Sequence, residues 1–144
     1  MKKIILSLMI CMMMLPLAAP AEDSDPFLDD YNTYAVSMYG IGKIAPVSSV
    51  ASSGVYASDT VQITVSPLSV TLTAETENAT DLIAAACCAL RVIDNQGSKI
   101  DQYGRVLHAY FMARSAGGEK RSVTESSVEI YVSVNDRLTI RVVR

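Results

Sequence analysis

Two adjacent cysteines, Cys87 and Cys88, are the residues of this sequence with the clearest capacity for chemistry. A disulfide between them would be strained, because neighbouring Cα atoms are about 3.8 Å apart and a relaxed bridge spans about 4.4–6.8 Å. Two thiolates are too few for a structural zinc site, and adjacent cysteines lack the Cys-x-x-Cys spacing of redox motifs. The pair therefore predicts packing in an apolar core, with an intermolecular disulfide as the alternative.

The other residue types that enzymes use occur without a catalytic pattern. His108 is the only histidine and alternates with apolar neighbours, which favours a structural position. Gly40 and Gly42 lack the third glycine and the following helix of a dinucleotide fingerprint. Glu75 and Glu77 are typical of a solvated face, and no Gly-x-Ser-x-Gly elbow is present. The sequence thus predicts a protein that is not an enzyme and that uses no metal or cofactor.

Residues 1–21 have the three parts of a secretory signal. Two lysines supply positive charge near the start, an apolar stretch follows, and small residues precede a cleavage site after Ala21. Pro16 ends the apolar stretch before it reaches the roughly 20 residues of a membrane-spanning helix. We expect cleavage and export to the periplasm, the cell surface or the medium; a retained anchor is the alternative.

Cleavage after Ala21 would leave 144 − 21 = 123 residues, the size of one domain. Without the two signal lysines the chain has 12 − 2 = 10 basic and 15 acidic residues, a net charge of −5. This acidic excess argues against a nucleic-acid partner. Five acidic residues fall within 22–30, so we expect an acidic flexible leader at 22–34 followed by a single domain at 35–144.

The alanine-rich stretch around the cysteines predicts a buried helix over about residues 79–94. Asn78 can cap its start, with Asp81 three residues later, and Gly97 is placed to terminate it in a left-handed conformation. Asn78 also begins an Asn-x-Thr glycosylation acceptor, which is the alternative role for this residue.

If this helix lies on a sheet, one stripe should face the strands and Cys87 should flank that stripe. The stripe consists of Leu82, Ala86, Leu90 and Ile93. Cys88 then points away from Cys87, because successive residues differ by about 100° around a helix. We expect Cys88 to be the more exposed thiol of a monomer and to lie between helices in an oligomer.

Alternating apolar residues predict strands on both sides of the helix. Residues 61–74 change the parity of their alternation at Pro67, which indicates one strand bent by a bulge or two strands meeting at a corner. Residues 105–114 are apolar on both alternating faces, which favours a central strand. Residues 31–58 contain enough Val, Ile and Tyr for one or two short strands.

The last two predicted strands, 128–134 and 138–142, form a hairpin whose register follows from the pattern. A three-residue loop at 135–137 places apolar residues opposite apolar residues, whereas a two-residue loop would mix the two faces. The favoured register puts Tyr131 opposite Arg141 on the outer face, where the ring and the guanidinium can stack. These two residues are therefore candidates, with Cys88, for a protein interface.

Together the elements predict an α+β fold, with one antiparallel-rich sheet of about four to five strands packed against a single alanine-rich helix. Several motifs within residues 52–137 also follow the order of a known family. They are Gly54, Val55, Ala57 and Asp59; Val61, Ile63 and Val65; Glu75, Thr76 and Glu77; and the alanine-rich helix. In this order the chain resembles the SIMPL domain of exported bacterial and archaeal envelope proteins, although Ser58 stands where that family has proline. The resemblance implies a non-enzymatic envelope protein that self-associates and is linked to stress tolerance, with no catalytic residues.

The sequence as a whole predicts an exported, non-catalytic protein that acts through protein–protein contact, as a homo-oligomer or with another envelope protein. A surface-exposed adhesive or structural β-rich protein, in which the helix is a minor element, is the alternative. Neither function requires nucleic acid, or insertion into a membrane once the signal has been removed.

Overall fold

The computed structural model describes residues 24–50, 53–95, 97–116, 120–123, 129–134 and 137–143. The helical elements in these ranges are α2 (Pro26–Tyr34), the π-helix η2 (Ala35–Tyr39), the 3₁₀ turn η3 (Thr76–Asn78), α3 (Ala79–Ile93) and α4 (Lys99–Ala116). The strands are β1 (Ala45–Val50), β2 (Ser53–Ala57), β3 (Gln62–Ser66), β4 (Ser69–Glu75), β5 (Lys120–Val123), β6 (Glu129–Val134) and β7 (Arg137–Val143).

The strands form one antiparallel sheet in the order β1-β2-β3-β4-β7-β6-β5. Strands β1 to β4 precede α3 in the sequence and pair in consecutive order, and strands β5 to β7 follow α4 and do the same. The pairing of β4 with β7 joins these two sets of strands. The predicted α+β class with an antiparallel-rich sheet is confirmed. The sheet is larger than expected, with seven strands, and more than one helix packs on it.

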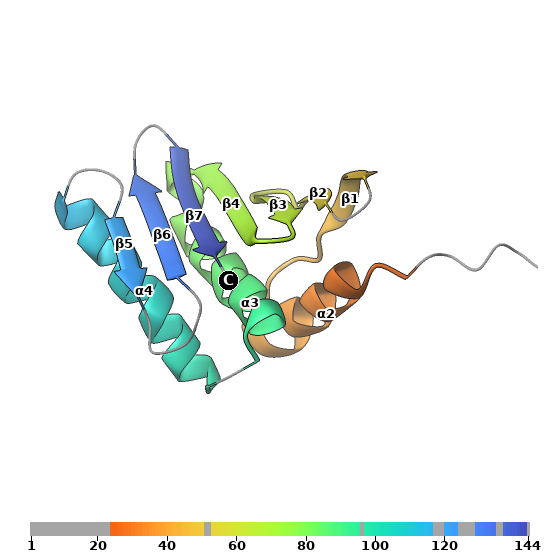
Figure 1. Cartoon of the computed structure of the whole chain (residues 1–144), viewed down its shortest axis with the longest axis horizontal. Helices are drawn as coiled ribbons and strands as arrows, with labels where there is room; N and C mark the ends of the chain where they lie inside the picture. Colours follow the sequence, from red (N-terminus) through yellow and green to blue (C-terminus); the bar gives the residue numbers. More distant parts are fainter. Residues whose placement is uncertain are drawn as a thin grey trace, which may run out of the picture.

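The helices form a layer on one side of the sheet. Figure 1 shows α3 and α4 behind strands β4, β7, β6 and β5, with α2 beside α3. Helix α3 packs on β4 and β7 and also contacts α2 and α4, whereas α4 packs on β5 and β6. Helix α3 therefore has neighbours on all sides, and every residue from Leu82 to Leu90 is buried.

The interpretation of residues 105–114 as a central strand is wrong, because this stretch lies inside helix α4. The buried residues of α4 are Gln102, Val106, Ala109, Tyr110 and Ala113. Their spacing of three and four residues is that of one helix face. The stretch has a single β-branched residue, and its leucine, alanines, methionine and arginines favour a helix. His108 is exposed on this helix rather than buried in a sheet.

The change of parity at Pro67 marks a chain reversal. Strands β3 and β4 form an antiparallel hairpin whose turn consists of Pro67 and Leu68, with Ser66 paired to Ser69. The bulge and the corner are therefore both wrong. The alternation of apolar residues nevertheless predicted the buried face of each strand. The register places Ile63 opposite Leu72, and the apolar residues Val61, Ile63, Val70, Leu72 and Ala74 are all buried.

The predicted register of the terminal hairpin is confirmed. Val134 pairs with Leu138, and Tyr131 pairs with Arg141, as a three-residue loop requires. The prediction succeeds because only this register keeps the apolar residues of both strands on one face. Strands β1 and β2 likewise confirm two short strands between residues 31 and 58.

The expected flexible leader is wrong for residues 26–34, which form helix α2, so the domain begins before residue 35. The Asp25 carboxylate caps this helix by accepting a hydrogen bond from the Leu28 amide at 3.2 Å, and it also accepts one from the Tyr56 hydroxyl. Tyr31 packs into the core. The acidic residues around it are the solvated side of an amphipathic helix, a pattern that net charge alone does not reveal.

The predicted signal, residues 1–21, lies outside the described residues. Among the helices that are described, none is both long and apolar enough to span a bilayer.

The ends of helix α3 lie close to the expected positions. Asn78 is at the N-cap position, but its side chain forms no capping hydrogen bond, because the turn η3 leads into the helix instead. The helix ends at Ile93, and Gly97 adopts the expected left-handed conformation (φ 80°) in the connection to α4.

Candidate functional site

A cavity of about 410 Å³ lies where the exit from η2, the β2–β3 turn and the first turns of α3 meet. It is lined by Tyr31, Gly40, Ile41, Gly42, Lys43, Ser58, Asp59, Thr60, Val61, Asp81 and Ala85. The lining combines charged and hydroxyl groups with a few aliphatic side chains, which is the composition of a site for a small polar molecule.

The loop 40–43 forms one wall of the cavity and is anchored at both ends. At its start, Gly40 takes a left-handed conformation (φ 64°) and the Ile41 amide donates to the Ala35 carbonyl at 3.0 Å. At its end, the Asn32 side chain accepts a hydrogen bond from the Ile44 amide at 2.8 Å and donates one to the Ile44 carbonyl at 3.1 Å. The loop is therefore positioned by α2 rather than by the sheet.

The β2–β3 turn forms a second wall. The Ser58 amide donates to the Val61 carbonyl at 2.9 Å, and the Ser58 hydroxyl accepts a hydrogen bond from the Val61 amide at 3.1 Å. These bonds close the turn and use the Ser58 side chain internally. Asp59 and Thr60, at the tip of the turn, are left to face the cavity and solvent.

The residues that line the cavity are mainly charged and hydrogen-bonding groups. No histidine or cysteine lines it, and the part of the chain that the structure describes has no cluster of three or more residues able to hold a metal ion. Burial, with a smaller contribution from Cys88, raises the pKa of Tyr31, so its hydroxyl is a neutral hydrogen-bond donor. The cavity therefore offers charges and hydrogen-bond donors to a ligand.

The cysteine pair lies in the core and not at a surface. Both residues are free and fully buried. The Cys88 thiol donates to the Tyr31 carbonyl at 3.2 Å, and the Cys87 thiol lies 3.9 Å from the Gln102 carbonyl. Burial raises the pKa of both thiols to about 12, so neither is a reactive thiolate at neutral pH. The expectation that Cys88 is the more exposed thiol is wrong, because α2 covers the side of α3 that a two-layer fold would leave open.

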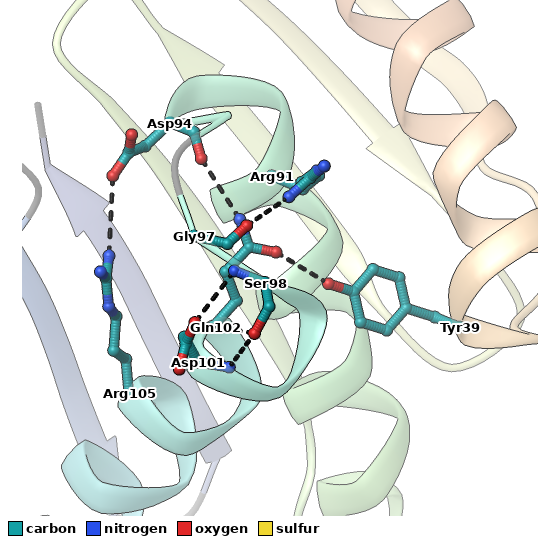
Figure 2. Close-up of polar contacts among 8 residues, drawn as sticks. All are labelled: Tyr39, Arg91, Asp94, Gly97, Ser98, Asp101, Gln102 and Arg105. Atoms are coloured by element: carbon teal, nitrogen blue, oxygen red, sulfur yellow. Dashed lines mark hydrogen bonds and ion pairs between the residues drawn. The ribbon is translucent and has the colours of Figure 1, made fainter.

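A polar network at the connection between α3 and α4 centres on Gln102, which is fully buried. Figure 2 shows its side chain between Tyr39 and Asp94. The Tyr39 hydroxyl donates to Gln102 Oε1 at 3.1 Å, and Gln102 Nε2 donates to the Asp94 carbonyl at 3.3 Å. Arg105 forms an ion pair with Asp94 at 3.7 Å. Sequence patterns did not indicate this network, because Tyr39 is 63 residues from Gln102 and the other members follow no recognised motif.

The same connection is closed by two further sets of contacts. Arg91 donates to the Gly97 carbonyl at 2.8 Å (Figure 2). The Ser98 amide and hydroxyl both donate to Asp101, at 3.0 and 2.7 Å, and these bonds lower the pKa of that carboxyl. The network thus fixes the angle between the helices and η2, and we interpret it as scaffold rather than as a binding site.

Helix α4 carries an apolar stripe beside its buried face, in which two residues pack partly against the core and two are exposed. The stripe consists of Ile100, Tyr103, Leu107 and Phe111, spaced by three or four residues. Ile100 is 82% exposed and Phe111 is 60% exposed, while Tyr103 and Leu107 are half-buried. We call these four residues the α4 stripe. Such an exposed apolar row is typical of a contact surface.

The structure separates the interface residues predicted from the sequence. Cys88 is inside the core, whereas Arg141 is exposed on β7 and alternates with the buried residues Ile140 and Val142, so it points away from the helices. The backbone of Tyr131 lies opposite Arg141, as predicted, and the Tyr131 side chain is outside the described part of the structure. Asn78 is half-buried at the end of η3, and its glycosylation stays a prediction.

Comparisons with known proteins give no independent indication of function. No protein-family model, no curated protein and no solved structure matches the chain. The resemblance to the SIMPL domain stays a prediction.

Proposed function

We propose that this protein is an exported, non-catalytic domain that acts through protein–protein contact, and that it self-associates through helix α4. The observation that carries the proposal is the α4 stripe. A monomeric protein seldom leaves large apolar side chains in a row on one helix, because their burial is worth about 1.5–3 kcal/mol each.

The geometry of the stripe suits a second copy of the same helix. In an antiparallel pair centred on Leu107, Tyr103 of one copy would lie opposite Phe111 of the other, and Leu107 would meet its own equivalent. Gly104 borders the stripe, and a side chain placed there would meet no atom of the chain. This open space allows a second helix to approach closely. A two-fold arrangement of this kind closes on itself as a dimer.

The setting agrees with a contact function. The signal predicted at residues 1–21 would bring the domain to the cell envelope or the medium. Buried thiols with raised pKa values suit an oxidising compartment, because they are protected from unwanted disulfide formation.

The test is the molar mass of the chain, expressed with its own N-terminus and purified as its host processes it. We expect a dimer at tens of micromolar in multi-angle light scattering, and a monomer after Phe111→Glu or Ile100→Glu. Val36→Glu is the matched control, because Val36 is an exposed apolar residue on η2 outside the stripe. A monomeric wild type, or a Phe111→Glu variant that stays dimeric, would contradict the proposal.

A second candidate, adhesion through the sheet, is favoured by one observation. Threonines pair across neighbouring strands on the face away from the helices, Thr64 with Thr71 and Thr73 with Thr139, and Thr71 pairs with Arg141. The same light-scattering series decides between the two surfaces. If Arg141→Glu disperses the assembly and Phe111→Glu does not, the sheet face is the contact surface.

A further inference from the structure

The cavity beside α3 contains charges of opposite sign that do not neutralise one another. Lys43 lies on the loop wall, Asp59 on the turn wall, and Asp81 on the first turn of α3. None of the three forms a hydrogen bond or an ion pair with another described residue. The lining of the cavity therefore includes one positive and two negative groups that a ligand can pair with.

A buried donor lies in the same cavity. The Tyr31 side chain is only 1% exposed, and its hydroxyl forms no hydrogen bond with any described residue. The hydroxyl is not among the fully buried polar atoms that lack a partner, so it is accessible from the cavity and can donate to a molecule bound there. The hydroxyl stays protonated because burial raises the pKa of Tyr31.

The rest of the lining limits the size and polarity of a ligand. Ile41, Val61 and Ala85 give the cavity an aliphatic part. Gly40 and Gly42 leave its mouth open, because a side chain at either position would occupy free space. The volume of about 410 Å³ is near the lower end of the range of about 300–1,000 Å³ for small-molecule sites.

We propose that this cavity binds a small zwitterion, a free α-amino acid with an aliphatic side chain. Lys43 and the Tyr31 hydroxyl would hold the ligand carboxylate, Asp59 and Asp81 its ammonium, and the aliphatic part of the cavity its side chain. This arrangement pairs every unused charge, which an anion or a cation alone would not do. The site is separate from the α4 stripe and does not depend on the oligomeric state.

Isothermal titration calorimetry of the purified chain tests the site with L-leucine, L-valine and L-alanine. We expect saturable binding of at least one of them. For that ligand, the N-acetyl form, which lacks the ammonium, and the amide, which lacks the carboxylate, should each bind about tenfold to a hundredfold more weakly, because a hydrogen bond to a charged group is lost. No saturable heat with any of the three amino acids would overturn the proposal.

Variants assign the two charges. Lys43→Gln should weaken binding of the free amino acid but not of its amide, and Asp81→Asn should weaken binding of the free amino acid but not of its N-acetyl form. Asp30→Asn is the matched control, because Asp30 is exposed on α2 and does not line the cavity. Equal losses for the free and blocked ligands, or equal effects of the control, would show that the charges do not recognise the ligand and would overturn the assignment.

Discussion

Helices α3 and α4 are consecutive, similar in length and packed on the same sheet, yet they differ in how much of their surface the fold covers. Helix α3 lies between the sheet, α2 and α4, and its residues Leu82–Leu90 are all buried. Helix α4 lies at the side of this layer, and only five of its 18 residues are buried. The difference teaches that an apolar residue stabilises the monomer in α3 and is available for contact in the α4 stripe.

The largest expected effect is on the stability of α3. Leu90→Ala removes a fully buried side chain from a helix that is covered on all sides, so the surroundings cannot collapse into the space. We expect the free energy of unfolding to fall by about 2–5 kcal/mol, measured by urea denaturation followed by circular dichroism. The matched change in α4 is Leu107→Ala, which should cost clearly less because Leu107 is half-buried. Equal losses would remove the contrast between the helices.

The contact that joins the two helices should give the next largest effect. Gln102→Ala leaves the Tyr39 hydroxyl and the Asp94 carbonyl without their present partner at a partly buried position, and it also removes a fully buried side chain. We expect a loss of about 2–3 kcal/mol in the free energy of unfolding. Tyr39→Phe is the control that removes a single hydrogen bond, and it should cost about 1 kcal/mol. A tolerated Gln102→Ala variant would mean that helix packing alone sets the angle between α3 and α4.

Alkaline pH should weaken the fold through the cysteines of α3. Their pKa of about 12 in the folded chain exceeds the ordinary thiol value of 9.0, so the unfolded chain loses these protons first. Stability is then complete below pH 9 and falls as the pH rises toward 12, by at most about 1.4 kcal/mol per pH unit for each thiol. A Cys87→Ala, Cys88→Ala variant should show a shallower fall in denaturation curves taken across this range. If the free energy of unfolding of this variant fell with pH as steeply as that of the wild type, the thiols would not be the cause of the fall.

Thiol labelling measures how well helix α3 is covered in the folded chain. We expect a thiol reagent at neutral pH to modify Cys87 and Cys88 only after unfolding, at similar rates, and in the presence or absence of the dimer. Selective labelling of Cys88 in the folded chain would show that α2 detaches from α3.

The smallest expected effect on stability is in the α4 stripe. Ile100→Ala should change the free energy of unfolding of the monomer by no more than about 0.5 kcal/mol, because Ile100 is exposed. It should nevertheless weaken the dimer, seen as a higher dissociation constant in sedimentation equilibrium. A large loss of monomer stability would show that the stripe belongs to the core.

The local sequence pattern determined those elements whose apolar residues fit a single periodicity, either helical or alternating. The alanine-rich stretch 82–90 is apolar on every side, and only a covered helix can bury it. The register of the terminal hairpin followed from its alternation, because a shift by one residue would turn Val132 and Ile140 toward solvent. The α+β class could be predicted from these two features together.

Tertiary structure decided what periodicity left ambiguous. Residues 105–114 fit both an alternating strand and a helix by periodicity, although their composition favours a helix. The helix is the form that buries Val106, Ala109 and Ala113 on one face. The acidic stretch before residue 35 forms a helix because Tyr31 and Phe27 on one of its faces pack into the hydrophobic core. Local sequence carries no information about such distant partners.

The candidate sites show the same division. The glycines at 40 and 42 fit no complete binding motif in the sequence, and no sequence pattern connects Lys43 with Asp59 or Asp81. These residues meet only because the fold brings three separate segments to one cavity. The sequence by itself determined which segments are apolar and with what period, since that depends on neighbours a few residues away. The tertiary structure decided which surfaces are covered and which charges share a cavity, since both depend on contacts between residues far apart in the chain.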